Sequence, residues 1–370
     1  MKIKINQEFK DKNLNFISSL RKSNTYNYLP CNEGLTKEGR RINLGFSCLA
    51  LKSIYILNES EKLQLEDKLN WVENINSYQL HSNNQYPKGS FIDEDYLQLV
   101  SKFNYYKESK RLLKKILNKN YKKKKIEIDE FIRAETKQAI STLYQVGSKN
   151  NINYENDLIS NNKIYDYLDS LNWRNPWSAG AQFSGLCVFL KSQKLHDNSY
   201  AHSEKLLNNF AQEILNMETG CYFKGERPSN SELINGTMKV LTGLDWLETP
   251  VHSPKQLIDT CLNIQPLGYG CDIVDIIYIL YMCSRETSYK KKEVIEYLEN
   301  IEFIIGRHYF FETGGFSYYE NKSQLYYYGL NITKGKNVPD LHGTMLLIWA
   351  CSMINFIKQK DDIKLNLIKP

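Results

Sequence analysis

The chain contains 370 residues, of which 42% are hydrophobic, 12% are aromatic and 24% are charged, and its formal net charge is +6. Its 19 glycines and 9 prolines are too few for a collagen-like or disordered protein, and a chain of this length buries a core without disulfide or metal staples. The eight cysteines are scattered and form no Cys-x-x-Cys pair, which excludes a disulfide scaffold and favours reduced thiols in a cytoplasmic protein.

Two kinds of helix are expected along the chain, and strand patterns are rare. The first kind is apolar nearly all round and must therefore be enclosed on every side; it is expected at 44–57, 184–190, 273–283 and 344–357. The second kind carries its apolar side chains on one stripe and is expected at 203–217 and 292–305. Their alternation favours an all-α double ring, in which an inner barrel of helices is wrapped by an outer one.

The basic character of the chain is local. Segment 102–125 contains eleven lysines and arginines but only one acid, Glu108. It therefore carries a formal +10, which leaves −4 for all other residues of this +6 chain. The run contains no glycine and no nucleic-acid motif, so it is interpreted as a solvated surface segment, and no nucleic-acid partner is expected.

No secretion signal or transmembrane segment is expected. Residues 1–6 lack the continuous apolar region of a signal peptide. The longest nearly uncharged apolar stretch, 344–357, has 14 residues, whereas about 18 are needed to cross a bilayer. It is interpreted as a helix buried inside the protein.

Two short motifs recur in the C-terminal half. Residues 218–223, ETGCYF, return as ETGGFS at 312–317, and residues 235–241, NGTMKVL, return as HGTMLLI at 342–348. Each copy consists of an amphipathic helix, a glycine and aromatic turn, a polar loop and an apolar helix. Residues 133–144 and 177–190 are interpreted as earlier, more diverged copies. Repetition at this spacing is typical of helical repeat proteins, and closure into a ring removes the need for capping repeats.

In a closed double ring the inner helices share one direction, so the polar clusters that open them meet at one mouth. The free N–H groups of helix starts favour anionic ligands there. The clusters lie at 172–182, 235–237, 271–275 and 340–344.

Asp340 and His342 form the cluster whose side chains are best suited to catalysis or metal binding. A carboxylate two positions before a histidine can orient the imidazole, act as an acid or join it in binding metal. The alternative interpretation is that Asp340 caps the helix and His342 is a first-turn packing or surface residue. The other copy of the motif has Asn235 in place of His342, so the repeat itself does not require a histidine.

Cys271 and Asp272 could share a zinc ion with His342, although no local ligand spacing supports it; otherwise Asp272 caps the helix and Cys271 packs. Asp275 begins an apolar helix, so it either faces a cavity or has a buried partner. The sequence therefore assigns Asp340, His342, Asp275 and Asp272 as catalytic candidates.

Aromatic and cationic residues near the same helix starts are candidates for substrate binding. Trp173 and Trp177 could form the walls of a hydrophobic or sugar site and Arg174 could bind an anion, or the tryptophans could anchor a helix that Pro176 initiates. The full set of binding candidates is Arg174, Trp173, Trp177, Gln182, Asn235, Gln324, Tyr328 and Lys336. The chain has no dinucleotide-binding, Walker, nucleophile-elbow or HExxH motif.

The repeats resemble the α/α-toroid superfamily of protein prenyltransferase β subunits and class II terpenoid cyclases. The turn that begins Gly314-Gly-Phe316 resembles the turns of that superfamily, and residues 334–344 resemble the segment carrying the prenyltransferase zinc histidine. The resemblance covers residues 133–357. The chain departs from the zinc motif because Cys271 and Asp272 are adjacent. The resemblance implies a single toroid domain over residues 1–370, with zinc as a candidate cofactor.

The expected function is that of an enzyme acting on a hydrophobic, lipid-like or small-molecule substrate with an anionic head group. One alternative is a carbohydrate-active (α/α) barrel, a hydrolase, lyase or epimerase in which Trp173 and Trp177 stack on sugar rings. The other alternative is a binding or scaffold toroid without catalysis.

Overall fold

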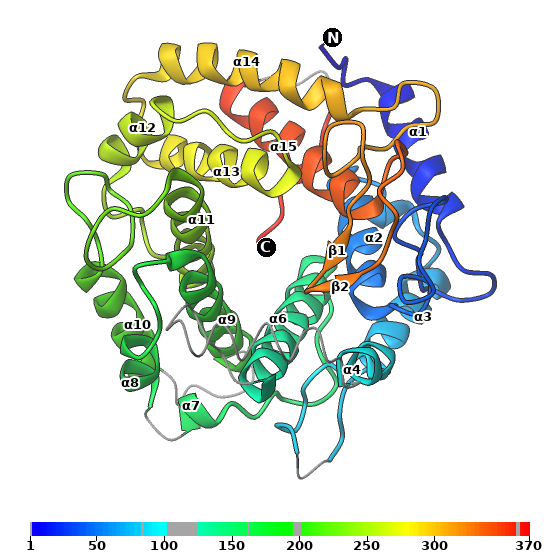
Figure 1. Ribbon diagram of the computed structural model, residues 1–370, viewed down its shortest axis with the longest axis horizontal. Helices are drawn as coiled ribbons and strands as arrows, with labels where there is room; N and C mark the ends of the chain where they lie inside the picture. Colours follow the sequence, from blue (N-terminus) through cyan, green and yellow to red (C-terminus); the bar gives the residue numbers. More distant parts are fainter. Residues whose placement is uncertain (1, 83–84, 102–123, 161–162, 195–200, 360–362) are drawn as a thin grey trace.

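The computed structural model describes residues 2–82, 85–101, 124–160, 163–194, 201–359 and 363–370, and α-helices dominate them (Figure 1). The expected all-α class is confirmed. The helices are α1 (Gln7–Ser19), α2 (Leu44–Ile56), η1 (Ser60–Lys62), α3 (Leu65–Asn76), α4 (Glu94–Ser101), α6 (Lys124–Gln145), α7 (Asp157–Ser160), α8 (Ile164–Asp169), α9 (Pro176–Lys194), α10 (Ala201–Glu213), α11 (Asn230–Trp246), α12 (Pro254–Leu262), α13 (Gly270–Glu286), α14 (Lys291–His308) and α15 (Leu341–Lys358).

The described strands form one small hairpin. β1 (Tyr326–Tyr327) pairs antiparallel with β2 (Leu330–Asn331), and Tyr327 is opposite Leu330. Of the basic segment 102–125, residues 102–123 lie outside the described residues, and Lys124 and Lys125 begin α6.

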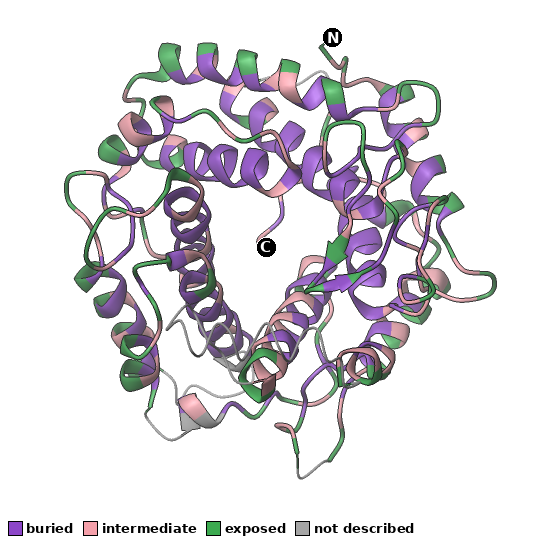
Figure 2. Ribbon diagram, in the orientation of Figure 1, coloured by how far each residue is buried: buried purple, intermediate pink, exposed green. Residues whose placement is uncertain are grey.

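Six helices contact one another in a closed cycle, in the order α2, α6, α9, α11, α13, α15 and back to α2 (Figure 1). Five of them, α2, α9, α11, α13 and α15, are buried along most of their length, because they have neighbours on several sides (Figure 2). The other helices cover this cycle from outside. α10 packs on α8 and α9, and α14 packs on α12, α13 and α15, with exposed residues on the outward face of α14.

The repeated motifs make the same contacts twice. In the first turn the backbones of Leu215 and Tyr222 form an isolated antiparallel β-bridge, and in the second turn those of Tyr309 and Phe316 do the same. The threonine of each Gly-Thr-Met motif then accepts a hydrogen bond from the turn's backbone, from Tyr222 N to Thr237 Oγ1 at 3.4 Å and from Phe316 N to Thr344 Oγ1 at 2.9 Å. The motif therefore ties each turn to the helix of the inner cycle that follows it.

A third copy of this tie lies in the diverged repeat expected at 133–144. Phe91 N donates to Thr136 Oγ1 of α6 at 3.0 Å, and Phe91 forms an isolated antiparallel β-bridge with Gln79. Thr136 lies within the diverged copy expected at 133–144, but its Gly and Met neighbours have been replaced. The hydroxyl alone preserves the contact.

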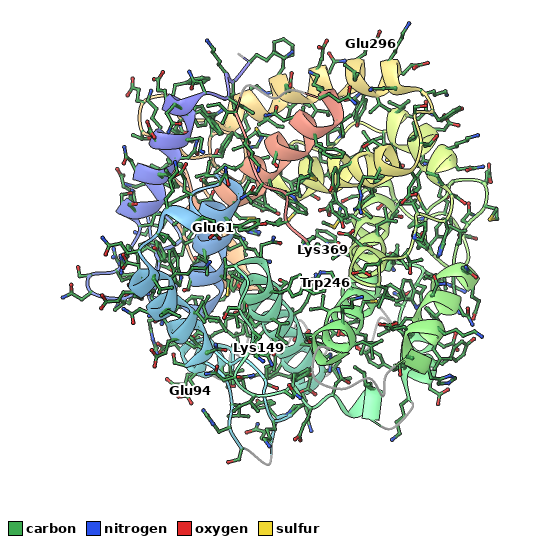
Figure 3. All side chains as sticks on the ribbon, turned by 180° about the vertical axis from the view of Figure 1, so that it is seen from behind. Glu61, Glu94, Lys149, Trp246, Glu296 and Lys369 are labelled. Atoms are coloured by element: carbon green, nitrogen blue, oxygen red, sulfur yellow. The ribbon has the colours of Figure 1, made fainter. Side chains whose placement is uncertain are left out.

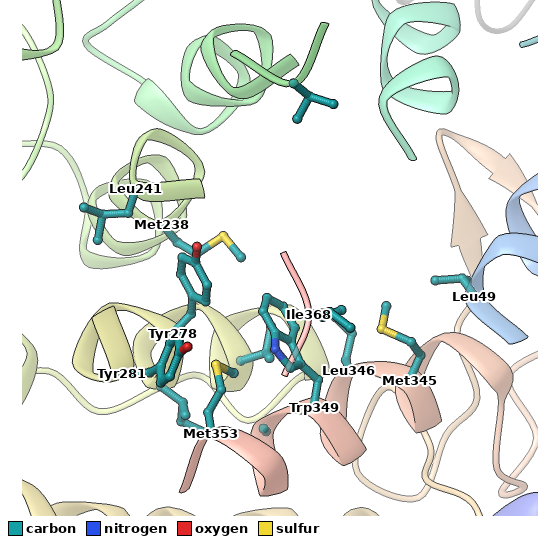
Figure 4. Packing of buried hydrophobic residues seen from close by; sticks show 14 of the residues in the cluster. Leu49, Met238, Leu241, Tyr278, Tyr281, Met345, Leu346, Trp349, Met353 and Ile368 are labelled. Atoms are coloured by element: carbon teal, nitrogen blue, oxygen red, sulfur yellow. The ribbon is translucent and has the colours of Figure 1, made fainter. Parts of the chain in front are cut away.

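The C-terminal residues close one end of the cycle. Asn366 donates from its side chain to Tyr55 O at the end of α2 at 2.9 Å, and Trp246 Nε1 at the end of α11 donates to Pro370 O at 3.1 Å. Lys369 and Trp246 lie side by side when the molecule is seen from behind (Figure 3). Ile368 is buried beside Trp349 of α15 (Figure 4).

One described helix, α15, is long and apolar enough to span a membrane, and 78% of its most apolar window is buried inside the structure. Its neighbours are α13, α14 and α2. The apolar surface of α15 is therefore covered by protein, as expected for a core helix.

Candidate functional site

The cycle of helices encloses a cavity of about 940 Å³, and all six of its helices contribute to the lining. Trp177, Cys271 and His342 are each the second residue of their helix, so the starts of α9, α13 and α15 surround one end of it. Ile368 and Pro370 line it as well, from the C-terminal residues that bind the ends of α2 and α11. The cavity thus extends between the starts of these helices and a floor formed by the end of the chain.

Three of the lysines that line this cavity come from three different helices. Lys52 of α2 is buried and donates to Ser141 Oγ at 2.8 Å, and burial lowers its pKa to about 8. Lys137 of α6 has its pKa lowered well below the ordinary lysine value by burial and by the charges of Lys239 and Lys52. Lys239 of α11 completes the group. The acids Glu127, Glu130, Glu232 and Asp275 also line the cavity. Lys52 and Lys239 therefore favour an anionic ligand on their own side of it.

Asp275 of α13 faces the same cavity and is 1% exposed. Its Oδ2 has no hydrogen-bond partner within the described residues. Burial raises its pKa to about 7, although the positive charges of Lys239 and Lys137 act in the opposite direction. Near neutral pH this carboxyl group therefore exists in both protonation states.

His342 lines the cavity on the neighbouring helix, α15, and stacks on Tyr318 with the ring centroids 5.3 Å apart. Burial and the charge of Lys239 lower its pKa to about 4. Its Nδ1 has no partner within the described part of the chain. The imidazole is therefore neutral at pH 7, and one of its ring nitrogens is buried without a hydrogen-bond partner.

Cys271 also lines the cavity, and burial raises the pKa of its thiol to about 11. The charge of Lys239 acts on Cys271, Asp275 and His342 alike. Lys239 therefore lies at the centre of the ionisable groups of α13 and α15.

Four of the predicted substrate-binding residues line the cavity. Trp177, Gln182, Gln324 and Tyr328 come from α9 and from the segment around the hairpin. Gln182 Oε1 accepts from Arg133 Nε at 2.8 Å, whereas Gln324 Oε1 has no partner among the described residues. Tyr328 is half exposed, so its ring is accessible.

Asp340 does not line the cavity; it caps α15 in the completely buried interior. Its Oδ1 accepts from Gly343 N at 2.8 Å, and its Oδ2 accepts from Tyr318 N at 2.7 Å and Gln324 N at 3.0 Å. Burial raises its pKa, and these amides lower it. No hydrogen bond joins the Asp340 carboxylate to the His342 imidazole in the described structure, so the capping alternative describes this residue.

Asp272 and Asn235 lie together behind the lining. Asp272 is buried at the start of α13 and accepts from Leu267 N, and the amide of Asn235 lies 3.5 Å from its Oδ1. Asn235 also donates to Ser231 O at 2.7 Å. The two residues thus join α11 to α13 and do not face the cavity lining.

Three further predicted binding residues are elsewhere. Trp173 is buried against Phe210 and donates to Leu168 O at 2.7 Å, Arg174 is exposed, and Lys336 pairs with Glu33 on the surface at 3.1 Å. None of these three lines the cavity.

The structure brings Cys271 and His342 to the same cavity, whereas Asp272 is engaged by the backbone of Leu267. Among the described residues, no group of three His, Cys, Asp or Glu side chains converges as a metal would require. The three residues therefore do not form the ligand set that the resemblance implies.

Sequence reasoning missed Lys52, Lys137, Lys239 and the buried pair Glu135–Tyr327. Tyr327 lines the cavity and donates to Glu135, whose pKa is raised to about 8 by burial. A signal existed for the lysines, because Lys52 and Lys239 are the only charged residues between 44–57 and between 233–244 respectively. A single charge in an enclosed helix has to face a cavity or a partner.

No protein-family model matches the chain, and the search of curated proteins found no match either.

Proposed function

We propose that this chain is an α/α-toroid enzyme that binds a hydrophobic substrate with an anionic group in its central cavity. The observation that carries the proposal is the combination of Lys52, Lys137 and Lys239 with apolar walls in one cavity of about 940 Å³. Leu49, Met238, Leu346 and Trp349 contribute to those walls. A cavity of this size encloses a small organic molecule and excludes most of the water around it.

Two groups of the cavity supply opposite acid–base capacities at pH 7. Asp275, whose pKa lies at about 7, can donate a proton. His342 is neutral, because its pKa is lowered to about 4, and its free Nδ1 can accept one. A pair of titratable groups with separated pKa values is the usual basis of general acid–base catalysis.

A ligand series in a thermal-shift assay tests the proposal. Geranyl diphosphate combines an apolar chain with an anion, whereas geraniol and inorganic diphosphate each present one part. We expect geranyl diphosphate to raise the Tm more than either part alone. Lys239→Met removes a charge-assisted contact, so its affinity for geranyl diphosphate is expected to fall about 10- to 100-fold.

Lys191→Met is the matched control, because Lys191 pairs with Glu248 at 3.3 Å and does not line the cavity. It is expected to bind the series like the unmodified protein. Equal Tm shifts in Lys239→Met and in Lys191→Met would contradict the proposal, and so would a series in which no compound raises the Tm.

A carbohydrate-active function is the second candidate, and the exposure of Tyr328 favours it. Trp177 and Tyr328 both line the cavity, and aromatic rings there can stack on sugar rings. The lysines would then neutralise uronate carboxylates. A Tm shift with oligouronates and none with geranyl diphosphate would favour this second function.

The ring itself also supports the toroid assignment, because the six contacts of the inner cycle run from α2 to α15 and return to α2. We extend the proposal to one toroid domain spanning the chain. All eight cysteines are free, which agrees with a reducing, cytoplasmic compartment.

A further inference from the structure

Lys137 differs from the other lysines of the cavity in its surroundings. Lys52 donates to Ser141, but no hydrogen bond or ion pair engages the amine of Lys137 within the described residues. Elsewhere, lysines such as Lys224 pair with carboxylates, at 2.8 Å to Asp169 in that case. Lys137 lines the cavity, and part of its side chain is exposed there.

The groups that face Lys137 come from four other helices. Lys52 of α2 and Lys239 of α11 repel a proton on its amine, whereas Cys187 of α9 and Asp275 of α13 act in the opposite direction. Burial is the largest cause and these charges act beside it, so that the pKa of Lys137 lies well below its ordinary value. More of this amine is therefore neutral at pH 7 than of a surface lysine, and only the neutral amine is a nucleophile.

We propose that Lys137 is a nucleophile that forms an imine with the carbonyl group of a ligand held in the cavity. This inference rests on the proposed function, because it assumes that an anionic, partly apolar molecule binds there. The ligand class is an aldehyde or ketone that also carries an anionic group. Lys239 and Lys52 would bind that anionic group and thereby hold the carbonyl carbon near Nζ of Lys137.

The reaction uses only groups already on the cavity wall. The lone pair of neutral Nζ attacks the carbonyl carbon, a C–N bond forms, and the carbonyl electron pair moves to oxygen. The nitrogen loses a proton and the oxygen gains one, which gives a carbinolamine. Asp275 in its acid form then protonates the hydroxyl group, and the C–O bond breaks to release water. The nitrogen lone pair completes the C=N bond, the iminium then returns its N–H proton to the Asp275 carboxylate to give the imine, and hydrolysis reverses the sequence.

Trapping with borohydride tests the imine. The probe is 2-oxooctanoate, which has an apolar tail, a carboxylate and a carbonyl group, and octanoate is the matched ligand without the carbonyl. Borohydride reduces an imine to a stable secondary amine that peptide mapping by mass spectrometry locates. We expect one adduct on Lys137, formed on the order of tenfold or more faster than on surface lysines, since each pKa unit changes the neutral fraction tenfold.

Lys137→Arg places a permanently charged side chain there that cannot form this imine, so it is expected to bind anionic 2-oxooctanoate in the thermal-shift assay without yielding the adduct. Lys191→Met is expected to be labelled at Lys137 as in the unmodified protein. The trapping rate in the unmodified protein should level off at a pH well below that of a surface lysine, and octanoate should compete with the reaction.

The outcomes separate this inference from the function on which it rests. If octanoate and 2-oxooctanoate both raise the Tm saturably but no adduct forms at Lys137, the imine is overturned and the anion-binding cavity is still supported. Adducts spread over surface lysines, equally abundant in Lys137→Arg, overturn it as well. If neither compound raises the Tm and no adduct forms, the proposed function is overturned together with the inference.

Discussion

At the residue scale, two buried aspartates demonstrate how strongly the surroundings of a carboxylate determine its role. Asp340 and Asp275 are 0% and 1% exposed. Asp340 accepts hydrogen bonds from three backbone amides, whereas Asp275 has an Oδ2 without a partner in the described structure. Asp340 is therefore a structural residue, and Asp275 is available for chemistry.

Replacement of each aspartate by asparagine is expected to have opposite effects on stability. In Asp340→Asn an amide group faces the N–H groups of Tyr318 and Gln324, so the free energy of unfolding should fall by about 2 to 3 kcal/mol. In Asp275→Asn a neutral group replaces a buried charge, so at about pH 8 the variant should be at least as stable as the unmodified protein. Urea denaturation measures both.

The difference in stability between Asp275→Asn and the unmodified protein changes with pH in a definite direction. The pKa of Asp275 is raised from 3.8 to about 7 in the folded state, so between these values the folded protein binds more protons than the unfolded one. Its contribution to stability is therefore complete at low pH and is lost as the pH rises to about 7. The advantage of Asp275→Asn should grow over the same range, and a constant difference would contradict the assignment.

At the element scale, the start of α15 depends on a close backbone approach. A Cβ atom on Gly343 would lie 2.4 Å from Tyr318 N and 2.6 Å from Ser317 C. Thr344, the next residue, donates from its hydroxyl to Asp340 O at 2.7 Å. The Gly-Thr pair is thus required where the turn after α14 meets the inner helix. Thr237 repeats the threonine contact, whereas the close neighbour of Gly236 is Pro176 at the start of α9.

Gly343→Ala is expected to destabilise the protein by about 1 to 3 kcal/mol, because the backbone of Ser317 and Tyr318 must move. Gly185→Ala is the control inside α9, where the added Cβ would meet Phe189 at an ordinary 3.6 Å. It should be neutral or stabilising by up to about 1 kcal/mol, since alanine favours helix. Thermal unfolding compares them, and equal losses would contradict the argument.

At the scale of the whole molecule, residues distant in sequence close the ring. α15 packs against α2, and Asn366 binds Tyr55 and Asn58 at the end of α2. The C-terminal residues then cross to α11 and provide Ile368 and Pro370 to the cavity. The attachment of this segment therefore places part of the cavity wall at that end.

Asn366→Ala removes the two side-chain hydrogen bonds, so the C-terminal segment should detach more often. Hydrogen exchange of the amides of 366–369 is expected to accelerate about tenfold, which corresponds to about 1.4 kcal/mol. Asn263→Ala is the control, because its amide donates only locally to Asp259 O at 2.8 Å on the exposed α12. Unchanged exchange in Asn366→Ala would mean that other contacts hold the segment.

The sequence predicted part of the candidate site. The polar clusters that open apolar helices led to Trp177, Cys271, Asp275 and His342, and these residues do line one cavity. The same rule also selected Asp340, Asp272 and Asn235, which are buried: Asp340 caps α15, Asp272 accepts from Leu267 N and Asn235 donates to Ser231 O. Local sequence cannot separate the two outcomes, because a carboxylate at a helix start suits both a cap and a cavity.

The sequence by itself determined the helical class, the distinction between enclosed and one-faced helices, and the repeated Gly-Thr motif, because each depends on the spacing of side chains along one helix. Only the tertiary structure decided which side chains share a space. Lys52, Lys137 and Lys239 are separated by at least 85 residues from one another, yet they face one cavity. Their mutual repulsion arises from through-space proximity, and the ring that creates this proximity depends on contacts between helices distant in the chain.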